Sequence, residues 1–82
     1  MRRLNWNVKR DAAEKPIVAA LQGVGADVWR ISGKWCPDLL VLFKGRLHAG
    51  EVKSKGGTLT KHQGAFEVWR TPDDALRAIG AI

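Results

Sequence analysis

The chain has little cysteine and no long apolar run, and each absence excludes a class of protein. Cys36 is the only cysteine, so neither an internal disulfide nor a cluster of thiolate metal ligands can form. This usage suits a reducing, cytoplasmic setting. No apolar stretch approaches the roughly 20 residues that a membrane-spanning helix needs. The basic start of the chain is not followed by an apolar segment, so we expect no signal peptide.

Repeats, linkers and low-complexity segments are also missing, so we expect a single domain. Residues 1–10 are polar and basic and are interpreted as an N-terminal arm, and residues 11–82 form the folded part. A chain this short buries only about 60% of the surface that its unfolded form exposes. Because it can build only one thin core, association into a homodimer would be a natural way to bury more surface.

Acidic residues are scarce relative to basic ones. The chain has 14 Lys and Arg against 8 Asp and Glu, a net charge of +6, and the excess is concentrated in residues 1–15 and 44–61. Clustered cations favour a polyanionic partner because binding releases condensed counterions. A basic surface also serves simply to keep a protein soluble. If the partner is a nucleic acid, we expect it to contact Arg2, Arg3, Lys9, Arg10, Lys34, Lys55 and Lys61.

Apolar periodicity and turn residues predict a mixed α/β domain. A first helix is expected from about residue 12 to residue 22, where Ile17, Val18 and Leu21 recur at helical spacing. A last helix is expected after Thr71 and Pro72, a pair typical of a helix start. Strands are expected at about residues 27–31, 38–43, 46–53 and 65–70.

The second and third of these strands should form a hairpin, since Lys44-Gly45 supplies a tight turn between them. Trp29 and Trp69 fall in strand patterns, and we expect both in the core. The resulting order is one helix, three strands, a connector, one strand and one helix.

Two carboxylates and an ammonium group should converge at one end of this hairpin. Side chains alternate faces along a strand, so Glu51 and Lys53 point the same way. The turn folds Asp38 back opposite residues 51 to 53. Two carboxylates about 4 Å apart repel by roughly 4 kcal/mol at an effective dielectric near 20. A divalent cation between them would remove this repulsion.

The available ligands indicate which cation that would be. Oxygen ligands without cysteine or paired histidine favour Mg²⁺ or Mn²⁺ over Zn²⁺. Such an ion polarises a phosphodiester oxygen and acidifies a bound water. Lys53 would orient that water or stabilise the charge that builds in the transition state.

Glu14 is a fourth candidate for the site. It shares a helix face with Ile17, Val18 and Leu21, and an acid within an apolar stripe needs a partner. The carboxylate cluster would provide one, through the metal or its waters. The alternative is an acid favoured by the helix dipole, or a capping box with Asp11.

These residues resemble a known nuclease signature. Pro37-Asp38, followed thirteen positions later by Glu51-Val52-Lys53, looks like the PD-(D/E)xK motif. The flanking residues are similar to those of the virus-type replication-repair nuclease (VRR-NUC) domains, which are related to archaeal Holliday-junction resolvases. The flanking likeness lies in Glu14 of the opening helix, the Gly45 hairpin and the segment Leu59-Thr60-x-x-Gln63.

The resemblance implies a fold, a partner and a set of roles. The fold would be a restriction-endonuclease-like αβββ(α)βα core around a mixed central sheet. The substrate would be structured or branched DNA, cut by a homodimer in the cytoplasm, and a phage or bacterial source would fit. Asp38 and Glu51 would ligate Mg²⁺ or Mn²⁺, with the Val52 carbonyl as a backbone ligand. Glu14 would contribute directly or through water, Lys53 would be the catalytic lysine, and Gln63 would lie at the edge of the active site.

The chain departs from this family in its connector. Only eleven residues, 54–64, separate Lys53 from Ala65, and Gly56, Gly57, Thr58 and Thr60 among them weaken a helix. We therefore expect the connecting helix to be shortened or missing, which leaves the role of Gln63 open. A short connector also favours the exchange of an element between two protomers.

Three functions stay open on the sequence alone. The first is a Mg²⁺-dependent endonuclease acting on structured or branched DNA. The second is a DNA- or RNA-binding module that keeps the nuclease fold with weak or no turnover. The third is a structural or interaction domain in which Lys53 pairs with Glu51 and Asp38.

Overall fold

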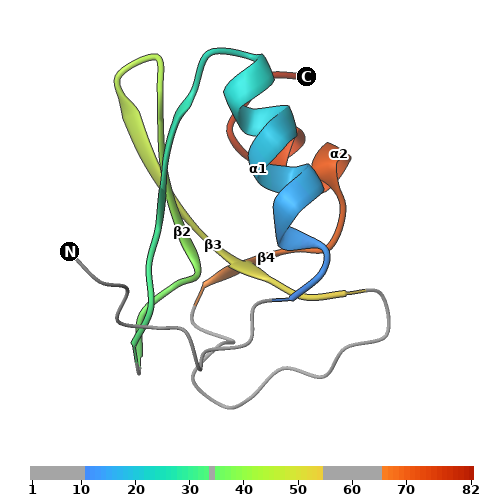
Figure 1. Ribbon diagram of the computed structural model, residues 1–82. Coiled ribbons are helices and arrows are strands. Elements are labelled where there is room, and N and C mark those ends of the chain that lie inside the picture. Colours follow the sequence, from blue (N-terminus) through green and yellow to red (C-terminus); the bar gives the residue numbers. More distant parts are fainter. Residues whose placement is uncertain (1–10, 34, 55–65) are drawn as a thin grey trace, which may run out of the picture.

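Two helices pack on one side of a four-stranded sheet (Figure 1). The computed structural model describes residues 11–33, 35–54 and 66–82. Along the chain the elements are α1 (Glu14–Gly23), β1 (Asp27–Arg30), β2 (Leu39–Phe43), β3 (Arg46–Val52), β4 (Glu67–Trp69) and α2 (Pro72–Ala78). The strands lie in the order β1-β2-β3-β4; the first two pairings are antiparallel and β3 pairs with β4 in parallel. The predicted mixed α/β class is confirmed.

Side-chain hydrogen bonds fix the chain just before α1 and at the start of α2. Before α1, the Asp11 carboxylate accepts a 2.9 Å hydrogen bond from the Ala13 N–H. At α2, Thr71 and Asp74 form a capping box, in which each side chain accepts a hydrogen bond from the other residue's N–H. The start of α2 that Thr71-Pro72 predicted is therefore confirmed.

The predicted hairpin is also present, as β2 and β3. Their register runs from the Leu39–Gly50 pair to the Phe43–Arg46 pair next to the turn. Lys44 and Gly45 both have positive φ, 50° and 78°. Two such residues are what a type I′ hairpin turn requires, and this turn matches the right-handed twist of the strands.

The core lies between the sheet and the helices. Its fully buried side chains include Ile17 and Leu21 of α1, Leu39 and Val41 of β2, and Trp69 of β4. The burial of Trp69 confirms the prediction for that residue.

The same prediction is wrong for Trp29, which is 51% exposed. In the β1–β2 register, Val28 pairs with Val41 of the core and Trp29 pairs with Leu40. Because neighbouring residues of a strand point to opposite faces, Trp29 lies on the sheet face away from the helices.

Several predictions fall outside the described residues. These concern the N-terminal arm, Lys34 and all of the connector except Ser54, so the shortened helix there stays a prediction. Within the part of the chain that the structure does describe, neither helix has the length and apolar character needed to cross a membrane.

Candidate active site

The hairpin brings Asp38 to the end of β3, as its spacing predicted. The Asp38 N–H donates a 3.1 Å hydrogen bond to the Gly50 carbonyl. Its carboxylate Oδ2 accepts a 2.8 Å hydrogen bond from the Val52 N–H. Continuing the Leu39–Gly50 pairing by one residue places Asp38 opposite Glu51. Asp38 therefore lies beside the segment that carries the other two members of the predicted trio.

Glu51 is a buried carboxylate, with only 2% of its surface exposed. It pairs with Val68 of β4, whereas the next residue, Val52, pairs with the core residue Trp69. Strand alternation therefore places Glu51 on the sheet face away from the helices. Burying a charged carboxylate costs free energy unless donors or a cation compensate.

Lys53 follows directly after β3 and is half-buried. Its backbone N–H donates a 3.3 Å hydrogen bond to the Trp69 carbonyl, which extends the pairing of β3 with β4 by one residue. On strand alternation its side chain shares the sheet face of Glu51. Asp38 and Glu51 thus lie at one end of the hairpin, and Lys53 follows directly after it.

Glu14 is buried on the helix side of the sheet and contacts an arginine. Its carboxylate is 1% exposed, and its Oε2 accepts a 2.6 Å hydrogen bond from Arg30 Nε. Arg30 pairs with the core residue Leu39, so it occupies the helix-facing side of β1. Sequence reasoning predicted the carboxylate cluster as the partner of Glu14 and missed Arg30. The available signal was that Arg30 lies two residues after Val28, on the same strand face.

The carboxylates do not gather into one metal cage in this arrangement. Across residues 11–33, 35–54 and 66–82, no group of three or more His, Cys, Asp and Glu side chains could hold a metal ion. Asp38 and Glu51 nevertheless lie at one end of the β2–β3 hairpin, with Asp38 hydrogen-bonded to the Val52 N–H. This donor set fits Mg²⁺ or Mn²⁺, which prefer few protein carboxylates and keep several waters.

Asp11 is a site neighbour that sequence reasoning missed. Besides its contact with the Ala13 N–H before α1, its Oδ2 accepts a 2.9 Å hydrogen bond from the Ser54 N–H, and its Oδ1 accepts one from the Ser54 hydroxyl. The Ser54 hydroxyl, the Ala13 and Ser54 N–H groups and the charge of Lys53 hold the pKa of Asp11 below its usual value. The sequence offered only a helix-capping signal for this residue.

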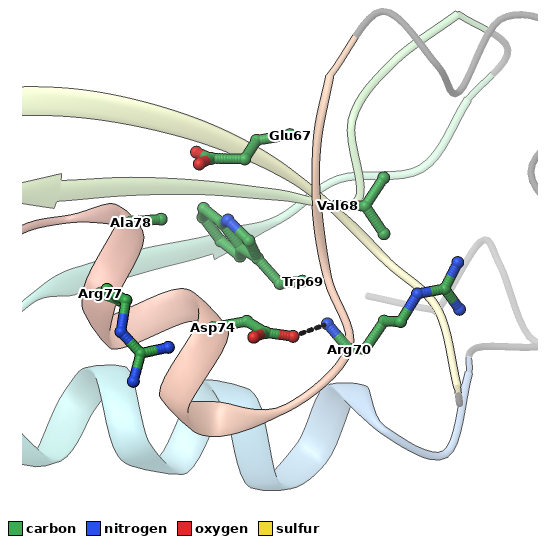
Figure 2. A pocket seen from close by; sticks show the side chains of 7 residues that line it. All are labelled: Glu67, Val68, Trp69, Arg70, Asp74, Arg77 and Ala78. Atoms are coloured by element: carbon green, nitrogen blue, oxygen red, sulfur yellow. Dashed lines mark hydrogen bonds between the residues drawn. The ribbon is translucent and has the colours of Figure 1, made fainter. Parts of the chain in front are cut away.

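Arg70 connects the same strand end to α2. Its Nη1 donates a 2.7 Å hydrogen bond to the Ser54 carbonyl, and its backbone N–H donates one of 3.0 Å to Asp74 Oδ2. Figure 2 shows the Asp74 contact at the edge of an open groove between β4 and α2. The charged residues along this groove are Glu67, Asp74, Arg70 and Arg77. Two acids and two arginines balance, so the groove gives no preference for a polyanion.

The excess positive charge of the chain lies outside the described residues. The described ranges hold seven of the 14 Lys and Arg residues and all 8 Asp and Glu residues. The other seven cations are the predicted nucleic-acid contacts Arg2, Arg3, Lys9, Arg10, Lys34, Lys55 and Lys61. Gln63 also lies outside, so its predicted place at the active site is not addressed.

Comparison with protein-family models, with curated proteins and with solved structures found no match to this chain. The function is therefore argued from the geometry and chemistry of the residues around Asp38 and Glu51.

Proposed function

We propose that the chain is a metal-dependent endonuclease of the VRR-NUC type, within the PD-(D/E)xK superfamily, that hydrolyses phosphodiester bonds of structured or branched DNA. The 2.8 Å hydrogen bond between Asp38 Oδ2 and the Val52 N–H carries the proposal, because it holds one carboxylate beside the buried Glu51. The mixed sheet with its flanking helices is compatible with a restriction-endonuclease-like core.

In this proposal Asp38, Glu51 and the Val52 carbonyl would hold Mg²⁺ or Mn²⁺. Glu14 contacts Arg30 on the helix side of the sheet and is left out of the ligand set. The ion, when bound, supplies a Lewis acid and an acidified water. The Lys53 ammonium would orient the attacking water or stabilise the charge that develops on the phosphoryl oxygens. The cations of the arm, of Lys34 and of the connector would bind the DNA backbone.

The proposal extends to assembly and setting. A homodimer, with or without an exchanged element, would present two active sites to the two sides of a DNA branch. Such an enzyme would act in the cytoplasm, in line with the single cysteine.

A second candidate is a nucleic-acid-binding module that keeps the fold with weak or no turnover. One observation favours it: the chain carries a net charge of +6, and clustered cations bind a polyanion without any catalytic step. This candidate uses the same basic residues and predicts binding without cleavage.

A cleavage assay separates the two candidates. The full chain is incubated with a labelled four-way DNA junction and with Mn²⁺ or Mg²⁺. Cleavage is expected for the wild type and is expected to disappear in Asp38→Asn and Lys53→Ala. Asp27→Asn is the matched control, because Asp27 is an exposed acid on β1 that pairs with Leu42, away from the site.

Each outcome of this assay has a distinct meaning. Junction binding without cleavage by the wild type would favour the binding module. If the wild type neither binds nor cuts the junction, the remaining hypothesis is a structural or interaction domain. Equal loss of cleavage in Asp27→Asn would mean that the assay reports general charge rather than the site.

A further inference from the structure

We propose that Asp11 is a positioning residue for Lys53, acting through Ser54. The inference rests on the proposed function, in which Lys53 is the catalytic lysine. Asp11 precedes α1 and Ser54 follows β3, so their contact joins positions 43 residues apart in the chain. A contact at this separation ties the segment before α1 to the end of β3.

Both oxygens of the Asp11 carboxylate are engaged with the residue directly after Lys53. Oδ2 accepts the Ser54 N–H at 2.9 Å, and Oδ1 accepts the Ser54 hydroxyl together with the Ala13 N–H. The Ser54 carbonyl in turn accepts a 2.7 Å hydrogen bond from Arg70 Nη1. Every hydrogen-bonding group of Ser54 is therefore fixed by another segment.

Three consecutive backbone N–H groups are fixed in this way. The Val52 N–H donates to Asp38, the Lys53 N–H donates to the Trp69 carbonyl and the Ser54 N–H donates to Asp11. Lys53 lies in the middle, so its Cα–Cβ direction is set from both sides. A lysine side chain is long and flexible, and its backbone direction decides where the ammonium group can reach.

Asp11 also supplies a negative charge near the lysine. The contacts with Ser54 and Ala13 hold the pKa of Asp11 below its usual value, so the carboxylate is ionised at neutral pH. Lys53 is among the groups that lower this pKa.

The local contact before α1 would not need this arrangement. That contact uses only the bond from the Ala13 N–H to Oδ1. Asp11→Asn keeps one acceptor oxygen for that bond and replaces the other with a donor, so it loses a contact with Ser54. Ser54→Ala removes the hydroxyl and leaves the contact between Asp11 and the Ala13 N–H in place, whereas Ser54→Thr retains a hydroxyl.

The test compares these three variants of the full chain with the wild type in single-turnover cleavage of the four-way junction. Misplacing a catalytic group by about 1 Å can lower a rate by about 10²-fold. We expect Asp11→Asn to approach this loss in the rate at saturating DNA, with junction affinity within about twofold of the wild type. Ser54→Ala should also lower the cleavage rate, and Ser54→Thr should keep most of the wild-type rate.

Thr71→Ala is the control for a general loss of stability. Thr71 caps α2 and its side chain contacts Asp74 rather than Ser54. This variant should keep the wild-type rate at temperatures where it stays folded. A rate loss in Thr71→Ala as large as in Asp11→Asn would overturn the positioning role.

Amide hydrogen exchange provides a measurement that does not depend on activity. In Asp11→Asn we expect exchange at the Lys53 and Ser54 amides to rise at least about tenfold, with Val41 of β2 unchanged. Unchanged exchange at Lys53 and Ser54 would overturn the inference, as would faster exchange with an unchanged cleavage rate. If the wild type cuts no junction, the proposed function fails, and the exchange at Lys53 alone decides whether Asp11 fixes this strand end.

Discussion

The indole ring of Trp69 lies directly over Gly50, where a Cβ atom would stand 2.4 Å from the ring carbons. Gly50 belongs to β3 and Trp69 to β4, so this contact packs the two parallel strands of the sheet against each other. The Gly50 carbonyl also accepts the hydrogen bond from the Asp38 N–H. The packing at Gly50 therefore supports the end of β3 where the proposed active site lies.

Gly50→Ala is expected to destabilise the fold. Trp69 is fully buried and cannot move aside cheaply, so the added methyl group overpacks the core. Overpacking of this kind costs about 1–3 kcal/mol, measured as the change in free energy of unfolding by urea. Gly23→Ala is the control, because a Cβ at Gly23 of α1 has no atom within 4 Å. Equal stability of the two variants would contradict the packing.

The contact between Arg30 and Glu14 gives a second prediction. Arg30→Ala removes a charged hydrogen bond from a carboxylate that is buried on the helix side of the sheet. Hydrogen bonds to charged groups contribute about 1.5–3 kcal/mol, and we expect the lower end because half of Arg30 is exposed. Arg46→Ala, at an exposed arginine of β3, should change the free energy of unfolding much less.

A double-mutant cycle refines this measurement. Glu14→Gln keeps the shape of the side chain and removes its charge. If the contact is what Arg30→Ala removes, the loss in the double variant should be smaller than the sum of the two single losses. Additive losses would show that Arg30 and Glu14 act independently.

The lowered pKa of Asp11 predicts an acid-dependent loss of stability. Its folded pKa lies below the usual value of 3.8. The ionised carboxylate therefore stabilises the fold fully above about pH 4, and this contribution is lost as the pH falls through the folded pKa. The difference in unfolding free energy between wild type and Asp11→Asn should shrink as the pH falls below that range. If this difference in unfolding free energy stayed constant with pH, the stabilising role of the ionised Asp11 would be contradicted.

Divalent metal should raise the thermal stability of the wild type. A ligand that binds only the folded state at about 100 times its Kd stabilises by about 2.7 kcal/mol. We expect Mg²⁺ or Mn²⁺ to raise the melting temperature of the wild type and not that of Glu51→Ala. Glu67→Ala, at an exposed acid of β4, should keep the full shift. The absence of any shift at millimolar metal would count against the proposed site.

The features that sequence reasoning predicted are local in the chain. Lys44-Gly45 specifies its turn, and the turn with strand alternation places Asp38 opposite Glu51 without knowledge of the rest of the fold. The start of α2 follows from Thr71 and Pro72 for the same reason. Such signals are confined to a few neighbouring residues and survive in any tertiary context.

The features that it missed depend on which parts of the chain meet in space. Alternation showed that Trp29 and Val28 face opposite ways, yet it did not say which face the helices cover. The partner of Glu14 could be named only once α1 was packed against β1. The contact between Asp11 and Ser54 joins positions 43 residues apart, and no local sequence pattern predicts it.

That separation also has a consequence for the order of folding. The stretch between Asp11 and Ser54 contains α1, β1 and the complete β2–β3 hairpin. Closing so long a loop costs entropy before its contacts are gained, and contacts distant in sequence form slowly. The surroundings of Lys53 are therefore complete only after that stretch has folded. During refolding, recovery of cleavage should lag behind recovery of the hairpin, because an incompletely folded chain lacks the geometry that the chemistry requires.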